Sequence, residues 1–143
     1  MVAAYGVTDG PDAMDEQQKP KISRETYSAG ECVFREGQFA TCAYIIESGR
    51  VEILKEAIGG PLLVNTLRAG ELFGEMALII DTNRTATVKA TEETALLVVN
   101  PGVLNAKLEA ADPVVRRLVK VLINRLREQM KARADDIAAV HTS

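Results

Sequence analysis

The period of the hydrophobic residues changes once along this chain, at Asn100. Before Asn100, apolar residues lie in short segments that alternate with polar residues and are separated by glycine-containing turns, which is typical of β-strands. After Asn100, apolar residues recur at spacings of three and four, the period of an α-helix. Strands first and helices last predict an α+β domain.

Turn and capping residues give approximate bounds for these elements. The expected strands cover residues 31–34, 43–47, 50–56, 62–67, 85–90 and 95–99. Gly59-Gly60 predicts a hairpin between the third and fourth of them. Asn100-Pro101 and Asp112-Pro113 each place a capping residue before a proline that suits the first helical turn. We therefore expect a short helix from Pro101 to about Ala111 and an amphipathic helix of about 20 residues from Val114 onward.

Length and composition limit the class of protein. The 143 residues suffice for one domain, which we place at 22–135, after an N-terminal arm at 1–21 and before a tail at 136–143. No apolar run approaches the ~20 residues that a membrane span needs, and no secretory signal is visible. The spacing of Cys32 and Cys42 matches neither a metal site nor a redox pair. We therefore expect reduced thiols, no membrane span and a cytoplasmic protein.

The charges divide unevenly between the two parts of the chain. The net charge is −3, but residues 113–143 carry 7 basic and 3 acidic residues, a net of +4, on an otherwise acidic chain. Basic amphipathic helices pack on their own domain, on a partner, on a membrane surface or on nucleic acid. The helix lacks aromatic anchors and spreads its Arg and Lys around its surface, which disfavours the last two. The pattern favours packing on the domain, a second copy or a protein effector.

Residues 73–88 contain the strongest candidates for a ligand-binding site. Gly74 permits a close backbone approach to a ligand, and the amides that open the following turn favour an anion. Arg84 offers a planar fork of donors that matches a phosphate. Glu75 can only accept hydrogen bonds, so its natural partner is a donor such as a sugar hydroxyl. Together these residues suit a compact anion that also carries a hydroxyl group.

This segment resembles the phosphate-binding cassette of the cyclic nucleotide-binding domain, the family of catabolite activator proteins, cyclic-nucleotide-dependent kinase regulatory subunits and cyclic-nucleotide-gated channels. The match at Phe73-Gly74-Glu75, at Ala77-Leu78 and at Arg84 with the following strand keeps the family spacing. Upstream segments follow the family order as well, including Phe34-Arg35-Glu36-Gly37 and Ser48-Gly49-Arg50-Val51. The chain departs at Asn83, where many members have Pro, and at Thr85, where others have Ala or Ser.

The resemblance implies a fold and a ligand site. The fold would be an antiparallel, jelly-roll-like β-roll followed by C-terminal helices. The ligand would be cAMP or cGMP, with Arg84 on the cyclic phosphate, Glu75 on the ribose hydroxyl and backbone amides supplied by Gly74 and Ala77. The residues expected to bind the ligand are Phe73, Gly74, Glu75, Met76, Ala77, Arg84, Thr85 and Thr87.

The sequence gives little support to catalysis. His141 is the single histidine, so neither a nucleophile–base pair nor a metal cluster can be assembled around it, and the phosphate-binding loop of nucleotide hydrolases is absent. We expect no enzyme activity, no cofactor and no metal. The expected function is a sensor that signals through movement of its C-terminal helices to a protein effector or within a homodimer. The alternative is a β-roll interaction or structural module that no longer binds nucleotide.

Overall fold

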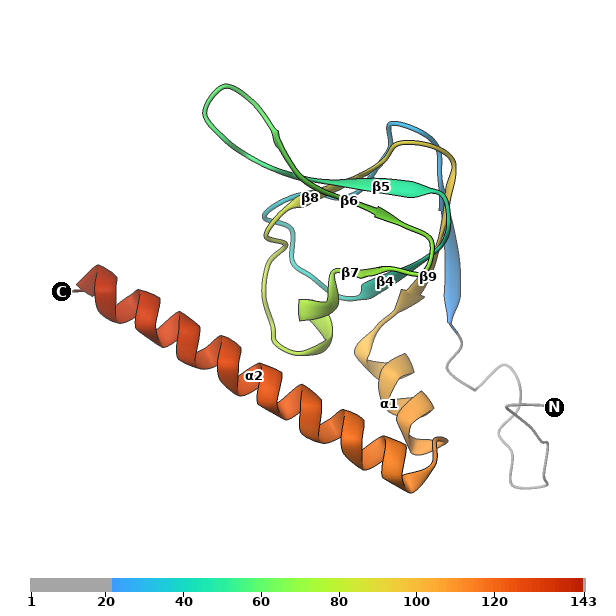
Figure 1. The fold of residues 1–143 in the computed structure, drawn as a ribbon, viewed down its shortest axis with the longest axis vertical. Helices are drawn as coiled ribbons and strands as arrows, with labels where there is room; N and C mark the ends of the chain where they lie inside the picture. The colour runs from blue at the N-terminus through green and yellow to red at the C-terminus, as the bar shows by residue number, and fades with distance from the viewer. Residues whose placement is uncertain (1–21, 143) are drawn as a thin grey trace.

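Two antiparallel sheets followed by two helices make up the part of the protein that the computed structural model describes, residues 22–142, with side chains described as far as Ala132. The strands are β2 (Ser23–Tyr27), β3 (Cys32–Phe34), β4 (Ala43–Ser48), β5 (Arg50–Lys55), β6 (Leu62–Arg68), β7 (Leu72–Phe73), β8 (Thr87–Ala90) and β9 (Thr94–Val99). They form two four-stranded sheets in the orders β2-β9-β4-β7 and β3-β8-β5-β6. The predicted β-roll with C-terminal helices is confirmed (Figure 1).

The hydrophobic core lies between the two sheets. The chain passes repeatedly from one sheet to the other, so strands that follow each other in sequence contribute to both sides of this core. β4 and β5 belong to different sheets, as do β6 and β7, and β8 and β9. Alternate residues of each strand therefore face the interior, and Ile46, Val51, Val88 and Leu96 are at most 2% exposed. The alternation seen in the sequence thus marks the inner face of both sheets.

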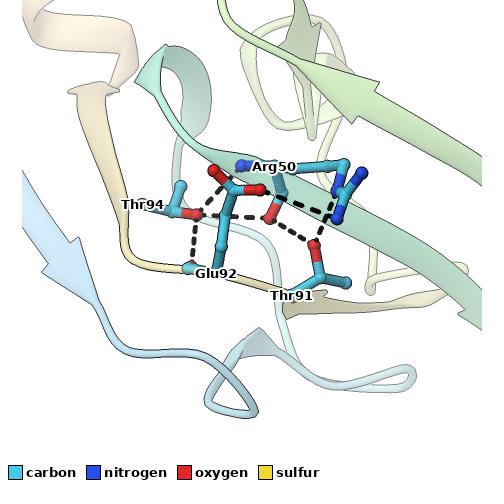
Figure 2. Close-up of polar contacts among 4 residues, drawn as sticks. All are labelled: Arg50, Thr91, Glu92 and Thr94. Atoms are coloured by element: carbon cyan, nitrogen blue, oxygen red, sulfur yellow. Dashed lines mark hydrogen bonds and ion pairs between the residues drawn. The ribbon is translucent and has the colours of Figure 1, made fainter.

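The corner between β4 and β5 depends on Gly49, which has a φ of 98°. A Cβ at this position would lie 2.5 Å from the carbonyl oxygen of Glu93 and would overlap Oγ1 of Thr94. Figure 2 shows the polar contacts among Arg50, Thr91, Glu92 and Thr94, which follow this corner in the fold. The buried Thr94 hydroxyl accepts a hydrogen bond from the Arg50 amide at 3.1 Å and lies 2.8 Å from the carbonyl oxygen of Glu92. This network ties the start of β5 to the start of β9.

The two helices begin at the predicted caps. The Asn100 side chain accepts a hydrogen bond from the Val103 amide at 2.8 Å before α1 (Pro101–Glu109). The Asp112 carboxylate accepts one from the Val114 amide, also at 2.8 Å, at the start of α2 (Pro113–Thr142). Figure 1 shows α1 between the sheets and α2, and the C-terminal part of α2 extending away from the β-roll.

Three features differ from the sequence predictions. β2 and β7 were not predicted: β2 is largely exposed and carries no clear apolar alternation, and β7 has two residues. Helix α2 has 30 residues instead of about 20 and covers most of the segment assigned to the tail. Four alanines after Lys131 explain the extension, because alanine is the strongest helix former. The predicted arm at 1–21 lies outside the described residues.

Candidate functional site

A single turn after β7 provides the first half of the candidate site. Gly74 adopts a left-handed conformation, with φ 73° and ψ 20°, and precedes a 3₁₀ helix, η1 (Glu75–Leu78). Glycine is required for two reasons. The left-handed region disfavours other residues, and a Cβ here would lie 2.7 Å from Nη1 of Arg84. Within residues 22–142, the amides of Glu75 and Met76 make no hydrogen bond, so both remain available to a ligand.

Arg84 provides the second half. Its side chain is buried, with 7% of the residue exposed, and it donates to the carbonyl oxygen of Cys42 at 2.7 Å and to that of Gly74 at 3.3 Å. Its guanidinium carbon lies 3.9 Å from the centre of the Phe34 ring. The Arg84 backbone is fixed as well, since its amide donates to the Gln38 carbonyl at 2.6 Å. The fold therefore holds the positively charged Arg84 guanidinium in a fixed position beside the glycine turn.

These two halves border one pocket of about 270 Å³. This volume is close to the lower end of the ~300–1,000 Å³ range of small-molecule sites. Six predicted residues line it: Phe73, Gly74, Glu75, Met76, Arg84 and Thr85. The structure adds residues that sequence reasoning missed: Phe34, Ala40, Ile53, Asn65, Leu67, Leu72, Thr82, Asn83, Ala86 and Val88. Phe34 belongs to a segment that already carried the family resemblance, whereas Asn65 and Ile53 had no local signal.

Glu75 and Thr85 lie at the exposed rim of the pocket. Among the side chains described, none forms an ion pair or hydrogen bond with the Glu75 carboxylate. A carboxylate in this state can accept a hydrogen bond from a ligand without first losing a protein partner.

Two predicted residues do not line the pocket. The Ala77 amide donates to the Gly74 carbonyl at 3.3 Å, and the Ala77 side chain borders a different hollow, beside α2. The Thr87 hydroxyl accepts a hydrogen bond from the Glu36 amide at 2.9 Å. The Ala77 amide and the Thr87 hydroxyl therefore already have hydrogen-bond partners within the protein. The assignment of these two residues to the ligand stays a prediction.

Helix α2 reaches the same turn from the other side. Nε of Arg127 donates to the carbonyl oxygen of Ile79, the residue that ends η1, at 2.7 Å. Nη1 of Arg127 also donates to the Asn124 side chain at 2.8 Å, which fixes its direction along the helix. The turn that carries Gly74 and Glu75 is therefore in direct polar contact with α2.

Other kinds of site find no support in the part of the chain that the structure describes. Cys32 and Cys42 form no disulfide in the structure. Residues 22–142 hold no group of three or more His, Cys, Asp or Glu side chains that could bind a metal ion. Neither described helix is long and apolar enough to cross a membrane.

Comparison with known proteins identifies the family. The profile described as "Cyclic nucleotide-binding domain" matches residues 24–111, which include all of both sheets except Ser23, together with the glycine turn and Arg84. The chain belongs to the cyclic nucleotide-binding domain family. The resemblance inferred from residues 73–88 is thereby confirmed.

Relatives of known name have the same domain within longer chains. The chain is 36% identical over 126 residues to the cAMP-dependent protein kinase regulatory subunit of Schizosaccharomyces pombe, covering 85% of this chain and 27% of that protein. It is 33% identical over 108 residues to the cyclic AMP receptor protein of Thermus thermophilus, covering 75% and 50%. The chain thus spans half or less of the length of these curated relatives.

A solved structure gives the same result at the level of the fold. The half-site-occupied form of the EAL enzyme Bd1971 is 38% identical with a TM-score of 0.73, and the similarity covers 76% of this chain and 98% of that one. The cAMP-bound form of this enzyme is 35% identical with a TM-score of 0.56, and the similarity covers 85% of this chain and 34% of that one. The cGMP-bound form is 36% identical with a TM-score of 0.57, and the similarity covers 84% of this chain and 32% of that one.

Proposed function

We propose that this domain binds a 3′,5′-cyclic nucleotide, cAMP or cGMP, and acts as a sensor of that ligand. One observation carries the proposal: a buried arginine and an exposed carboxylate border the same pocket, at the two residue types and positions that the family uses. The proposal draws further support from the relatives, whose names or solved forms include cAMP and cGMP.

Each part of the pocket would then have a chemical role. Arg84 would neutralise the cyclic phosphate, helped by the unpaired amides of Glu75 and Met76 at the start of η1. The Glu75 carboxylate would accept the hydrogen bond of the ribose 2′-hydroxyl. Ile53, Leu67 and Val88 would cover the purine, since these three apolar residues of one sheet line the pocket.

A titration tests this proposal directly. Calorimetry with cAMP, cGMP and 5′-AMP should give saturable binding for at least one cyclic nucleotide. Binding of 5′-AMP should be much weaker, because its phosphate is not closed onto the ribose and loses conformational freedom when it binds. Failure of the folded protein to bind either cyclic nucleotide would contradict the proposal.

We further propose that ligand binding is transmitted through α2 to a protein effector or to a second copy of the chain. The support is the hydrogen bond from Arg127 to the end of η1, which links the phosphate side of the pocket to the helix. An apolar strip on α2 remains exposed and could receive the partner; its residues are Val115, Leu118, Leu122 and Leu126, between 44% and 57% exposed.

The alternative is a β-roll that no longer binds nucleotide. One observation favours it: Arg84 already donates to two carbonyl oxygens, as a purely structural arginine would. The same titration separates the two functions. In either case we propose a regulatory, non-catalytic domain, and the two free thiols support a reducing compartment such as the cytoplasm.

A further inference from the structure

Half of the tyrosine and phenylalanine residues of this chain gather in one place. The sequence holds three Phe, three Tyr and no Trp. Phe34, Tyr44 and Phe73 form a cluster in which Phe34 lies 5.9 Å from each of the other two ring centres, and Tyr44 and Phe73 stack at 5.2 Å. We call these three residues the aromatic platform. They come from β3, β4 and β7, so the platform joins the two sheets.

Arg84 lies directly on this platform. Its guanidinium carbon is 3.9 Å from the centre of the Phe34 ring and 5.8 Å from that of Tyr44. Both distances are within the ~6 Å range in which the face of an aromatic ring attracts a cation. Burial raises the pKa of Tyr44, so its phenol stays neutral and adds no negative charge beneath Arg84.

The other contacts of the guanidinium are also uncharged. Its hydrogen-bond acceptors are the carbonyl oxygens of Cys42 and Gly74, with the Cys42 sulfur at 3.9 Å. Among the described side chains, no carboxylate lies within ion-pair distance of Arg84. A carboxylate partner would hold the arginine but would also neutralise it and compete with an anionic ligand. The aromatic rings and the carbonyl oxygens hold the Arg84 guanidinium in place without neutralising its positive charge.

We propose that Phe34, backed by Tyr44 and Phe73, is a positioning residue that holds Arg84 in a binding-ready orientation without consuming its charge. The inference rests on the proposed function, because it assigns the held charge to the phosphate of a cyclic nucleotide. An arginine ordered in advance loses less conformational freedom on binding, so the platform raises affinity without touching the phosphate itself. The alternative is that the three rings serve packing alone.

Substitutions at Phe34 distinguish these roles. Phe34→Leu removes the ring and keeps most of the apolar volume, whereas Phe34→Tyr keeps the ring. Phe39→Leu is the matched control, because Phe39 is 60% exposed and belongs to no ring contact among the described residues. Calorimetry with cAMP and cGMP should show about a tenfold loss for Phe34→Leu, near wild-type affinity for Phe34→Tyr and no change for Phe39→Leu.

A spectroscopic readout separates positioning from packing. In the ligand-free protein, the Arg84 side-chain NMR signals should be shifted by the Phe34 ring current, should lose that shift in Phe34→Leu and should regain it in Phe34→Tyr. Wild-type affinity in a folded Phe34→Leu variant would overturn the positioning role and leave the proposed function standing. No binding of either nucleotide by the wild type would instead overturn the proposed function, and the positioning role with it.

Discussion

At the residue scale, the fold holds the two charged residues of the pocket in opposite ways. Arg84 is buried and held by a ring and two carbonyl oxygens, whereas Glu75 is exposed and has no partner among the described side chains. Both residues line the pocket, but only Arg84 also holds the fold together through its own hydrogen bonds. Substitutions at the two positions should differ accordingly in their effect on stability.

Arg84→Ala should weaken cyclic nucleotide binding by roughly tenfold to a hundredfold, because a charge-assisted hydrogen bond contributes ~1.5–3 kcal/mol. It should also lower the free energy of unfolding by ~1–3 kcal/mol, since the Cys42 carbonyl loses its buried donor. Calorimetry and urea denaturation measure the two effects separately. Unchanged affinity in a folded variant would remove Arg84 from the site.

Glu75→Gln should weaken binding of cAMP or cGMP with little change in stability, because the carboxylate is exposed and an amide accepts a hydroxyl proton less strongly. The corresponding 2′-deoxy nucleotide lacks that proton and should bind both proteins almost equally. If the substitution costs the same affinity for both ligands, Glu75 does not contact the ribose.

At the element scale, glycines with similar backbone conformations have different importance. Gly49 and Gly30 have φ values of 98° and 92°, but an added Cβ at Gly30 would meet no atom within 4 Å, whereas at Gly49 it would overlap the β9 strand. Gly49→Ala should therefore cost at least ~2 kcal/mol of stability, and Gly30→Ala less, near the ~1 kcal/mol of the backbone strain alone. Equal losses in thermal or urea unfolding would show that the corner tolerates a side chain.

The contact between η1 and α2 gives a second prediction at this scale. Ligand binding should change the hydrogen exchange of α2 in the wild type, and Arg127→Ala should reduce that change, because it removes the bond to the Ile79 carbonyl. Arg125→Ala is the control: Arg125 is exposed and lies on the same helix. Equal responses in all three proteins would exclude Arg127 as the link.

At the scale of the whole molecule, the exposed strip on α2 is an apolar surface that a partner could cover. If a second copy covers it, the wild type should sediment as a dimer at raised concentration, and Leu122→Glu should shift it to a monomer. Ile58→Glu is a suitable control, since Ile58 is fully exposed in the turn between β5 and β6 and does not belong to α2. A monomer under all conditions, with and without nucleotide, would leave a protein effector as the proposed partner.

Features that depend on neighbouring residues could be predicted before the fold was known. Alternation marked the inner faces of the longer strands, capping residues fixed the starts of both helices, and Gly74, Glu75 and Arg84 lie close enough in sequence for their spacing to carry the family pattern. Such features follow from local sterics and hydrogen bonding, which are readable over about ten residues.

Contacts between distant segments, in contrast, could be seen only in the folded protein. β2 pairs with β9, Arg84 donates to Cys42, and Phe34 lies beneath the guanidinium, although each pair is far apart in the chain. These contacts are chosen by the joint burial of two sheets, for which no local pattern exists. The same burial brings the Thr87 hydroxyl to the Glu36 amide and places Ile53 and Asn65 in the lining of the pocket.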